Sequence, residues 1–114
     1  MTASFDQYRV DLERTVDRLR SMGIARLAAS FEPEETRAQA ARALIARLAD
    51  AGAEIEGRAP RAVPTLNDAA LGDQLAVIGR DLIVALEDSA IATADRVALA
   101  DQLTAELVEF RRRI

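Results

Sequence analysis

Large apolar residues recur at helical spacing between residues 65 and 89, TLNDAALGDQLAVIGRDLIVALEDS. Successive members of this row lie four, three, four and four positions apart, which is the period of one helix face. A second row of small and apolar residues lies beside it, so the apolar sector covers about half of the helix surface. We therefore predict a central helix from Asn67 to about Ser89 that touches two or three neighbours. The first row consists of Leu71, Leu75, Ile78, Leu82 and Leu86.

Two glycines stand in the second row of this helix. Gly72 and Gly79 each cost the helix about 0.8–1 kcal/mol relative to alanine. Interior helix glycines usually have a packing reason, so we predict that another backbone approaches closely here, within the chain or across a homodimer. The predicted interaction site for helix close-packing comprises Ala69, Gly72, Ala76, Gly79 and Ile83.

The first part of the chain predicts a helix that begins near Ser4. Its apolar stripe is Phe5, Tyr8, Leu12, Val16 and Leu19, and the charged residues Asp6, Asp11, Arg14, Asp17 and Arg18 lie largely outside the stripe, as on a solvated surface. Gly23 allows two interpretations. The helix ends there in a left-handed turn with Ile24 packing back, or it continues to Ala29. In both cases we expect residues 24–31 to be buried.

A second helix is predicted to begin in the acidic segment around Pro33, which suits a first helical turn, and to run to about Ala51 with Gly52 as its stop. Residues 52–64, GAEIEGRAPRAVP, contain two glycines and two prolines and predict a linker. Extended, such a segment reaches about 40 Å and can cross a whole bundle.

A last helix is predicted from Thr93 to Ile114. The arginines at its end, residues 111–113, favour a complement to the helix C-terminus over a docking tail.

These elements predict one all-α domain over residues 1–114. We expect a four-helix bundle-like arrangement built from two helical hairpins, residues 4–51 and 65–114, joined by the linker 52–64. The length of 114 residues suits one domain with a core of its own.

Composition removes several chemistries. The chain has no cysteine and no histidine, and all 15 of its basic residues are arginine. The commonest metal ligands and proton carriers are therefore missing, and we predict no catalytic residue, cofactor or metal. A net charge of −4 argues against nucleic acid as a partner. The start of the sequence lacks a signal-peptide pattern, and no apolar run reaches the length of a membrane span, so we expect a cytoplasmic protein without a membrane partner. The alanine- and arginine-rich composition suggests a GC-rich bacterial genome.

Asp81 lies at the edge of the apolar sector. If it were buried, it would need a partner such as Arg14, Arg96 or Tyr8, and we expect a half-exposed structural residue.

The leading functional hypothesis is a small non-catalytic helical protein that acts through protein–protein interaction or self-association, with a homodimer as one form. The alternative is a bundle that binds a small apolar ligand in its core. An enzyme that uses carboxylates or arginines has no supporting constellation, and DNA binding is disfavoured by charge.

Overall fold

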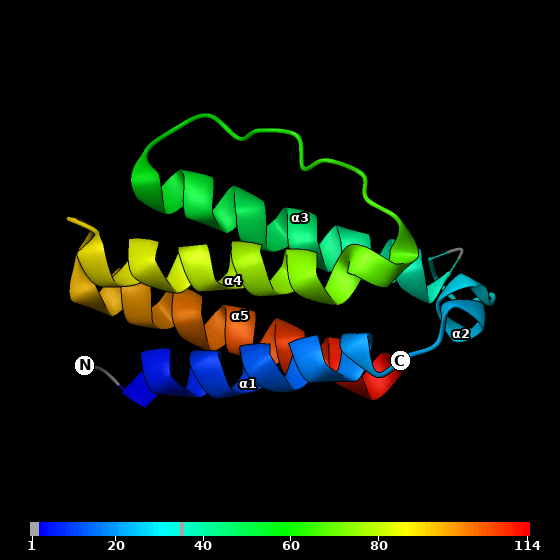
Figure 1. Ribbon diagram of the computed structural model, residues 1–114. Helices are drawn as coiled ribbons and strands as arrows, with labels where there is room; N and C mark the ends of the chain where they lie inside the picture. Colours follow the sequence, from blue (N-terminus) through cyan, green and yellow to red (C-terminus); the bar gives the residue numbers. More distant parts are fainter. Residues whose placement is uncertain (1–2, 35) are drawn as a thin grey trace.

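The computed structural model describes residues 3–34 and 36–114, and the regular structure within them is helical (Figure 1). This confirms the predicted all-α class. The described part measures 43 × 28 × 22 Å along its principal axes. Its α-helices are α1 (Ala3–Arg20), α2 (Ile24–Ala28), α3 (Arg37–Glu56), α4 (Leu71–Asp88) and α5 (Thr93–Arg113). A turn of 3₁₀ helix, η1 (Asp68–Ala70), leads directly into α4.

The long helices pair differently from the predicted hairpins. Helix α1 lies against α4 and α5, and α4 also lies against α3. By contrast, α1 with α3 and α4 with α5 make little contact, although these are the pairs that the two hairpins would join. Figure 1 shows that α1 and α5 run in one direction and α3 and α4 in the other. The cause is the segment between α3 and α4, which returns along α3 so that both helices start at the same end of the molecule (Figure 1).

Helix α4 uses its apolar sector against both neighbours. Its leucines at 71, 75, 82 and 86 are at most 1% exposed. Val77 and Val84 on the opposite side, among charged residues, are 60% and 57% exposed. The buried leucines belong to one continuous apolar core that includes residues of α1, α3 and α5. The central helix is therefore enclosed on one side and exposed on the other. Asn67 precedes η1, but its side chain makes no capping hydrogen bond.

Helix α3 begins later and ends later than predicted. It begins at Arg37, because the Thr36 side chain accepts the Gln39 amide at 3.1 Å and so caps the helix. Glu35, part of the acidic segment expected to start the helix, lies outside the described residues. Gly52 does not stop the helix. It is buried within α3, and the chain turns instead at Gly57, whose φ of 68° and bond to the Ala53 carbonyl end the helix.

The chain between α1 and α3 was predicted incorrectly in two respects. Gly23 breaks the helix, but its φ of −68° and ψ of 155° are extended rather than left-handed. A separate short helix, α2, follows. Of residues 24–31 only Leu27 is buried, and Ile24 is 54% exposed, because one short helix covers too little of the core to bury both of its faces. The expectation of a buried segment is therefore wrong for most of its length.

Residues 58–67, here called the strap, run along the outside of α3 (Figure 1). The strap is shorter than the predicted linker 52–64 at its start, because α3 occupies residues up to Glu56. Two side chains hold it: Gln74 donates to the Pro64 carbonyl at 2.8 Å, and Arg42 donates to the Leu66 carbonyl at 2.9 Å. Val63 packs partly on the core, and the other strap residues are exposed.

Candidate interaction surfaces

Most of the predicted close-packing residues lie inside the molecule. Ala69 is exposed, whereas Gly72, Ala76, Gly79 and Ile83 are buried. A Cβ on Gly79 would lie 2.4 Å from Leu12 Cδ1, and one on Gly72 would lie 2.7 Å from Arg20 Cγ. The Tyr8 hydroxyl also donates to the Gly79 carbonyl at 3.0 Å. Both glycines thus face α1 of the same chain. At Gly72 the backbone of α1 is near, with Arg20 N at 3.3 Å and Val16 O at 3.4 Å from the Cβ position, whereas at Gly79 the nearest atoms all belong to the Leu12 side chain.

Ion pairs follow the outer edge of the contact between α1 and α4. Arg20 pairs with Asp73 at 2.8 Å, and Arg80 binds both carboxylate oxygens of Glu13, at 3.0 and 2.6 Å. The hydrogen bond from Arg80 holds the pKa of Glu13 below its usual value. Arg9, Glu13 and Arg20, which pair with α4, lie beside the face that we interpreted as solvated, and of that face Asp6, Arg14, Asp17 and Arg18 are exposed. Periodicity within α1 could not reveal these pairs, because every partner comes from another helix.

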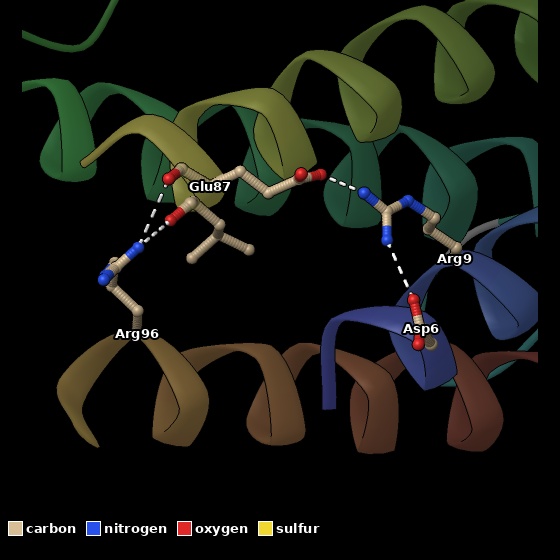
Figure 2. A network of polar contacts seen from close by, with 5 residues as sticks. Asp6, Arg9, Glu87 and Arg96 are labelled. Atoms are coloured by element: carbon tan, nitrogen blue, oxygen red, sulfur yellow. Dashed lines mark hydrogen bonds and ion pairs between the residues drawn. The ribbon is translucent and has the colours of Figure 1, made fainter. Parts of the chain in front are cut away.

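The third pair of this edge is part of a network at the end of α4. Arg9 bonds Asp6 at 3.1 Å within α1 and also pairs with Glu87 on α4. Figure 2 shows Arg96 of α5 reaching the main-chain oxygens at the end of α4, with the Leu86 carbonyl at 2.7 Å. A cation at a helix C-terminus complements the helix dipole and satisfies carbonyls that have no partner inside the helix. These contacts join α1, α4 and α5 at this end of the molecule.

Asp11 is buried instead of solvated, which corrects its predicted place outside the apolar stripe. Its side chain is 4% exposed and accepts Arg111 Nη2 at 2.7 Å and Gln7 Nε2 at 2.6 Å. Arg111 Nη1 also donates to the Asp11 carbonyl and the Thr15 hydroxyl, at 2.9 and 3.0 Å. Arg111 thus joins α5 to α1 rather than complementing its own helix end. We interpret this network as a structural one.

Four arginines gather where α1, α2, α3 and α5 meet, and we call Arg18, Arg26, Arg37 and Arg113 the arginine cluster. Three of them donate to the Ile114 main-chain oxygen: Arg26 at 2.7 Å, Arg18 at 3.3 Å and Arg37 at 3.4 Å. The guanidinium carbons of Arg37 and Arg113 lie 4.8 and 5.2 Å from the centre of the Phe31 ring. Arg113 also pairs with Glu34. The sequence pattern did not reveal this cluster, because its members come from four separate segments.

A shallow hollow of about 320 Å³ lies between α3 and α5, and we call it the α3/α5 groove. The two helices touch each other less than the other neighbouring pairs of long helices do. Its lining is mainly apolar. Arg47 and Glu106 face each other across it at 3.2 Å, and Glu106 Oε2 is buried without a hydrogen-bond partner among the described residues. The groove is lined by Ala43, Leu44, Arg47, Glu106, Glu109, Phe110 and Arg113.

Further hollows lie beneath the strap, along the contact between α3 and α4. The largest, of about 750 Å³, opens between the strap and the C-terminal part of α4 and is lined by charges of both signs. Asp81 lines it and is exposed, not half-exposed, and none of its expected partners bonds to it. Arg96 and Tyr8 bond main-chain oxygens of α4 instead. Because its lining includes Arg58 and Arg61 as well as Asp81 and Asp88, the hollow presents no single charge to a ligand.

Within residues 3–34 and 36–114, no three acidic, histidine or cysteine side chains come together as a metal site would require. No helix of the described part combines the length and the apolarity needed to cross a membrane. The chain matches no protein-family model, and no significant match was found among curated proteins or solved structures.

Proposed function

We propose that the chain is a four-helix bundle-like, non-catalytic protein that binds a helical segment of another protein chain in the α3/α5 groove. The observation that supports this proposal is the sparse contact between α3 and α5, which leaves a mainly apolar floor open beside charged residues. Protein interfaces commonly combine an apolar centre with a polar rim. A helix can place apolar side chains three or four positions apart in such a groove.

The depth and shape of the groove suit protruding side chains. Its floor is formed by Leu44 of α3 and Phe110 of α5, both of which also belong to the core. At about 320 Å³ it is at the small end of the range, about 300–1,000 Å³, for pockets that enclose a drug-sized molecule. These properties favour a few side chains of a partner over a whole enclosed ligand.

The rim offers a polar contact for the partner. Arg47 occupies only Oε1 of Glu106, and Oε2 is buried without a donor in the described part of the chain. Buried carboxylate oxygens are nearly always hydrogen-bonded, so an N–H or O–H group of a bound segment would satisfy this atom. The partner is either a different protein or a second copy of this chain, and the same groove serves both.

The proposal can be tested with a photo-crosslinking residue at Ala43, an exposed position that lines the groove. The matched control carries the same residue at Val77, which is exposed on α4 and does not line the groove. We expect one defined protein, or the chain itself, to be crosslinked from Ala43 in cells and not from Val77. Equal crosslinking from both positions, or from neither, contradicts the proposal.

A second experiment fills the groove without changing a core residue. In the variant Ala43→Arg a long cationic side chain occupies the groove, and Ala98→Arg places the same side chain on the exposed face of α5. Light scattering and crosslinking should show that A43R loses the complex and A98R keeps it. Circular dichroism checks that both variants remain equally helical. If A43R keeps the complex, the partner binds elsewhere and the groove assignment fails.

A further inference from the structure

We propose that the arginine cluster is a binding site for a phosphate group. Arg18, Arg26 and Arg37 come from three different helices, yet each places a guanidinium nitrogen within 3.4 Å of one oxygen, that of Ile114. Like charges held this close repel one another unless an anion lies among them. The convergence of three guanidiniums on one point is therefore the main observation behind the proposal.

The cluster is not neutralised by the residues bonded to it. Glu34 is the carboxylate that pairs with it in the described part of the chain, and Glu34 binds Arg113. Among the described residues bonded to the cluster, Glu34 and a full negative charge on the Ile114 oxygen would still leave the four guanidiniums an excess of two positive charges. The whole chain has a net charge of −4, so this excess is a local feature and not a property of the surface in general.

The cluster also keeps hydrogen-bond donors for a ligand. A guanidinium carries five N–H donors, and Arg18 and Arg26 each direct one nitrogen at Ile114, with no other bond to a described residue. Both side chains are exposed, so their remaining donors face solvent. Phe31 fixes the other two arginines, because their guanidiniums lie against its ring at 4.8 and 5.2 Å. An anion can thus bind beside Ile114 without displacing it.

The arrangement favours a phosphate group over a carboxylate. Guanidiniums bind both groups in a bidentate manner, but a carboxylate offers two oxygens and one charge. A phosphate group offers three or more oxygens and up to two charges, which matches guanidiniums approaching from several directions and the local excess of positive charge. The site shares Arg113 with the lining of the α3/α5 groove, but it is inferred from the convergence of guanidiniums on Ile114 and not from the apolar floor, so the two proposals rest on different observations.

The test is calorimetric titration of the full chain with inorganic phosphate, with ionic strength held constant by sodium chloride. We expect saturable binding with one site per chain, and about tenfold or greater weakening in the double variant R18Q/R26Q. Arg26→Lys keeps the positive charge but loses the paired N–H donors of the guanidinium, so it should weaken phosphate binding less than R26Q does. The control is Arg61→Gln. Arg61 is an exposed arginine of the strap, and its side chain has no partner among the described residues. This variant should bind phosphate as the unchanged chain does.

Other results of the titration test the identity of the ligand and the location of the site separately. Binding of acetate as tightly as phosphate would overturn the assignment to a phosphate group, and unchanged binding in R18Q/R26Q would overturn the site itself. Absence of saturable phosphate binding would overturn both. Circular dichroism of R18Q/R26Q must match that of the unchanged chain, which is expected because both arginines are exposed. Arg18 and Arg26 do not line the groove, so R18Q/R26Q should keep the crosslink from position 43, and failure of the groove proposal and failure of this one are distinguishable.

Discussion

The buried carboxylate of Asp11 accepts a hydrogen bond from Arg111 at 2.7 Å, across 100 positions of the sequence. This pair joins the middle of α1 to the end of α5. Burial alone would raise the pKa of Asp11, but the hydrogen bonds from Gln7 and Arg111, together with the charge of Arg111, outweigh burial and hold the pKa below its usual value of 3.8. The ionised pair is therefore the form that the fold stabilises.

Arg111→Gln should destabilise the protein by about 1–3 kcal/mol, because it leaves the buried Asp11 carboxylate without its main partner. Urea denaturation followed by circular dichroism measures this loss. Arg112→Gln is the matched control, since the Arg112 side chain is 75% exposed and lies 3.9 Å from Glu109. Its effect should stay below about 0.5 kcal/mol. Equal losses in the two variants would show that the Asp11 pair contributes nothing specific.

The stability contributed by Asp11 should disappear in acid. A carboxyl group whose folded-state pKa is lowered stabilises the protein fully above its unfolded pKa, and this contribution is lost as the pH falls through the folded-state pKa. Asp11→Asn should therefore be less stable than the unchanged chain at pH 7, and the difference should shrink steadily below about pH 4. Urea midpoints of both chains between pH 7 and pH 3 test this. A difference that stays constant over that range would contradict the lowered pKa.

Alanine substitutions at three helix glycines should change the stability of the protein by amounts that differ in sign and size. Gly79→Ala places a Cβ 2.4 Å from Leu12 Cδ1, and Leu12 is itself buried, so we expect a loss of about 1–3 kcal/mol. Gly72→Ala meets Arg20 Cγ at 2.7 Å, which can move, and the main-chain atoms Arg20 N and Val16 O at 3.3 and 3.4 Å, which cannot, so we expect a smaller loss of about 1 kcal/mol. At Gly52 the nearest atom lies 3.9 Å away, so Gly52→Ala should gain up to about 1 kcal/mol from helix propensity.

Thermal and urea denaturation of the three variants provide the test of this order. If Gly79→Ala is as stable as Gly52→Ala, then α1 and α4 do not approach as closely as the structure indicates. The oligomeric state should be the same in all three variants, because each of these glycines is buried within one chain.

Tyr8, the single tyrosine of the chain, should ionise only when the protein unfolds. Burial raises the pKa of Tyr8 far above its usual value of 10.0, and its hydroxyl donates to the Gly79 carbonyl. An acid whose folded-state pKa is raised stays neutral in the fold, so stability is lost as the pH rises above 10. The phenolate absorbance should appear together with the loss of helical circular dichroism. A phenolate signal near pH 10 from a fully helical protein would contradict the burial of Tyr8.

The placement of the helices was largely predictable, and the choice between competing end signals was not. Gly52 and Gly57 are equally good stop signals within the same stretch. The structure ends α3 at Gly57 because the extra turn adds the buried Ala53 and the partly buried Ile55 to the apolar surface packed within the fold. Such a choice depends on what lies opposite the helix, and local sequence does not contain that information.

The candidate sites were even less predictable. The arginine cluster takes its members from four separate segments, and the α3/α5 groove exists because two helices far apart in the chain lie side by side with little contact. No spacing in the sequence connects Arg18 to Arg37 or Leu44 to Phe110. Gly72 and Gly79 stand out in the sequence because glycine inside a helix is a local signal. The sequence does not identify the helix that they face.

The sequence by itself determined an all-helical chain, the buried leucine row of α4 and its exposed valines, because helical periodicity is a short-range property. Only the tertiary structure decided that α1 is the neighbour of α4 and α5, that Asp11 is buried against Arg111, and that four arginines share one end of the molecule. The physical reason is that charges and helix faces acquire partners through packing between segments distant in the chain. A charged residue in the sequence has the same local pattern whether it meets water or another helix.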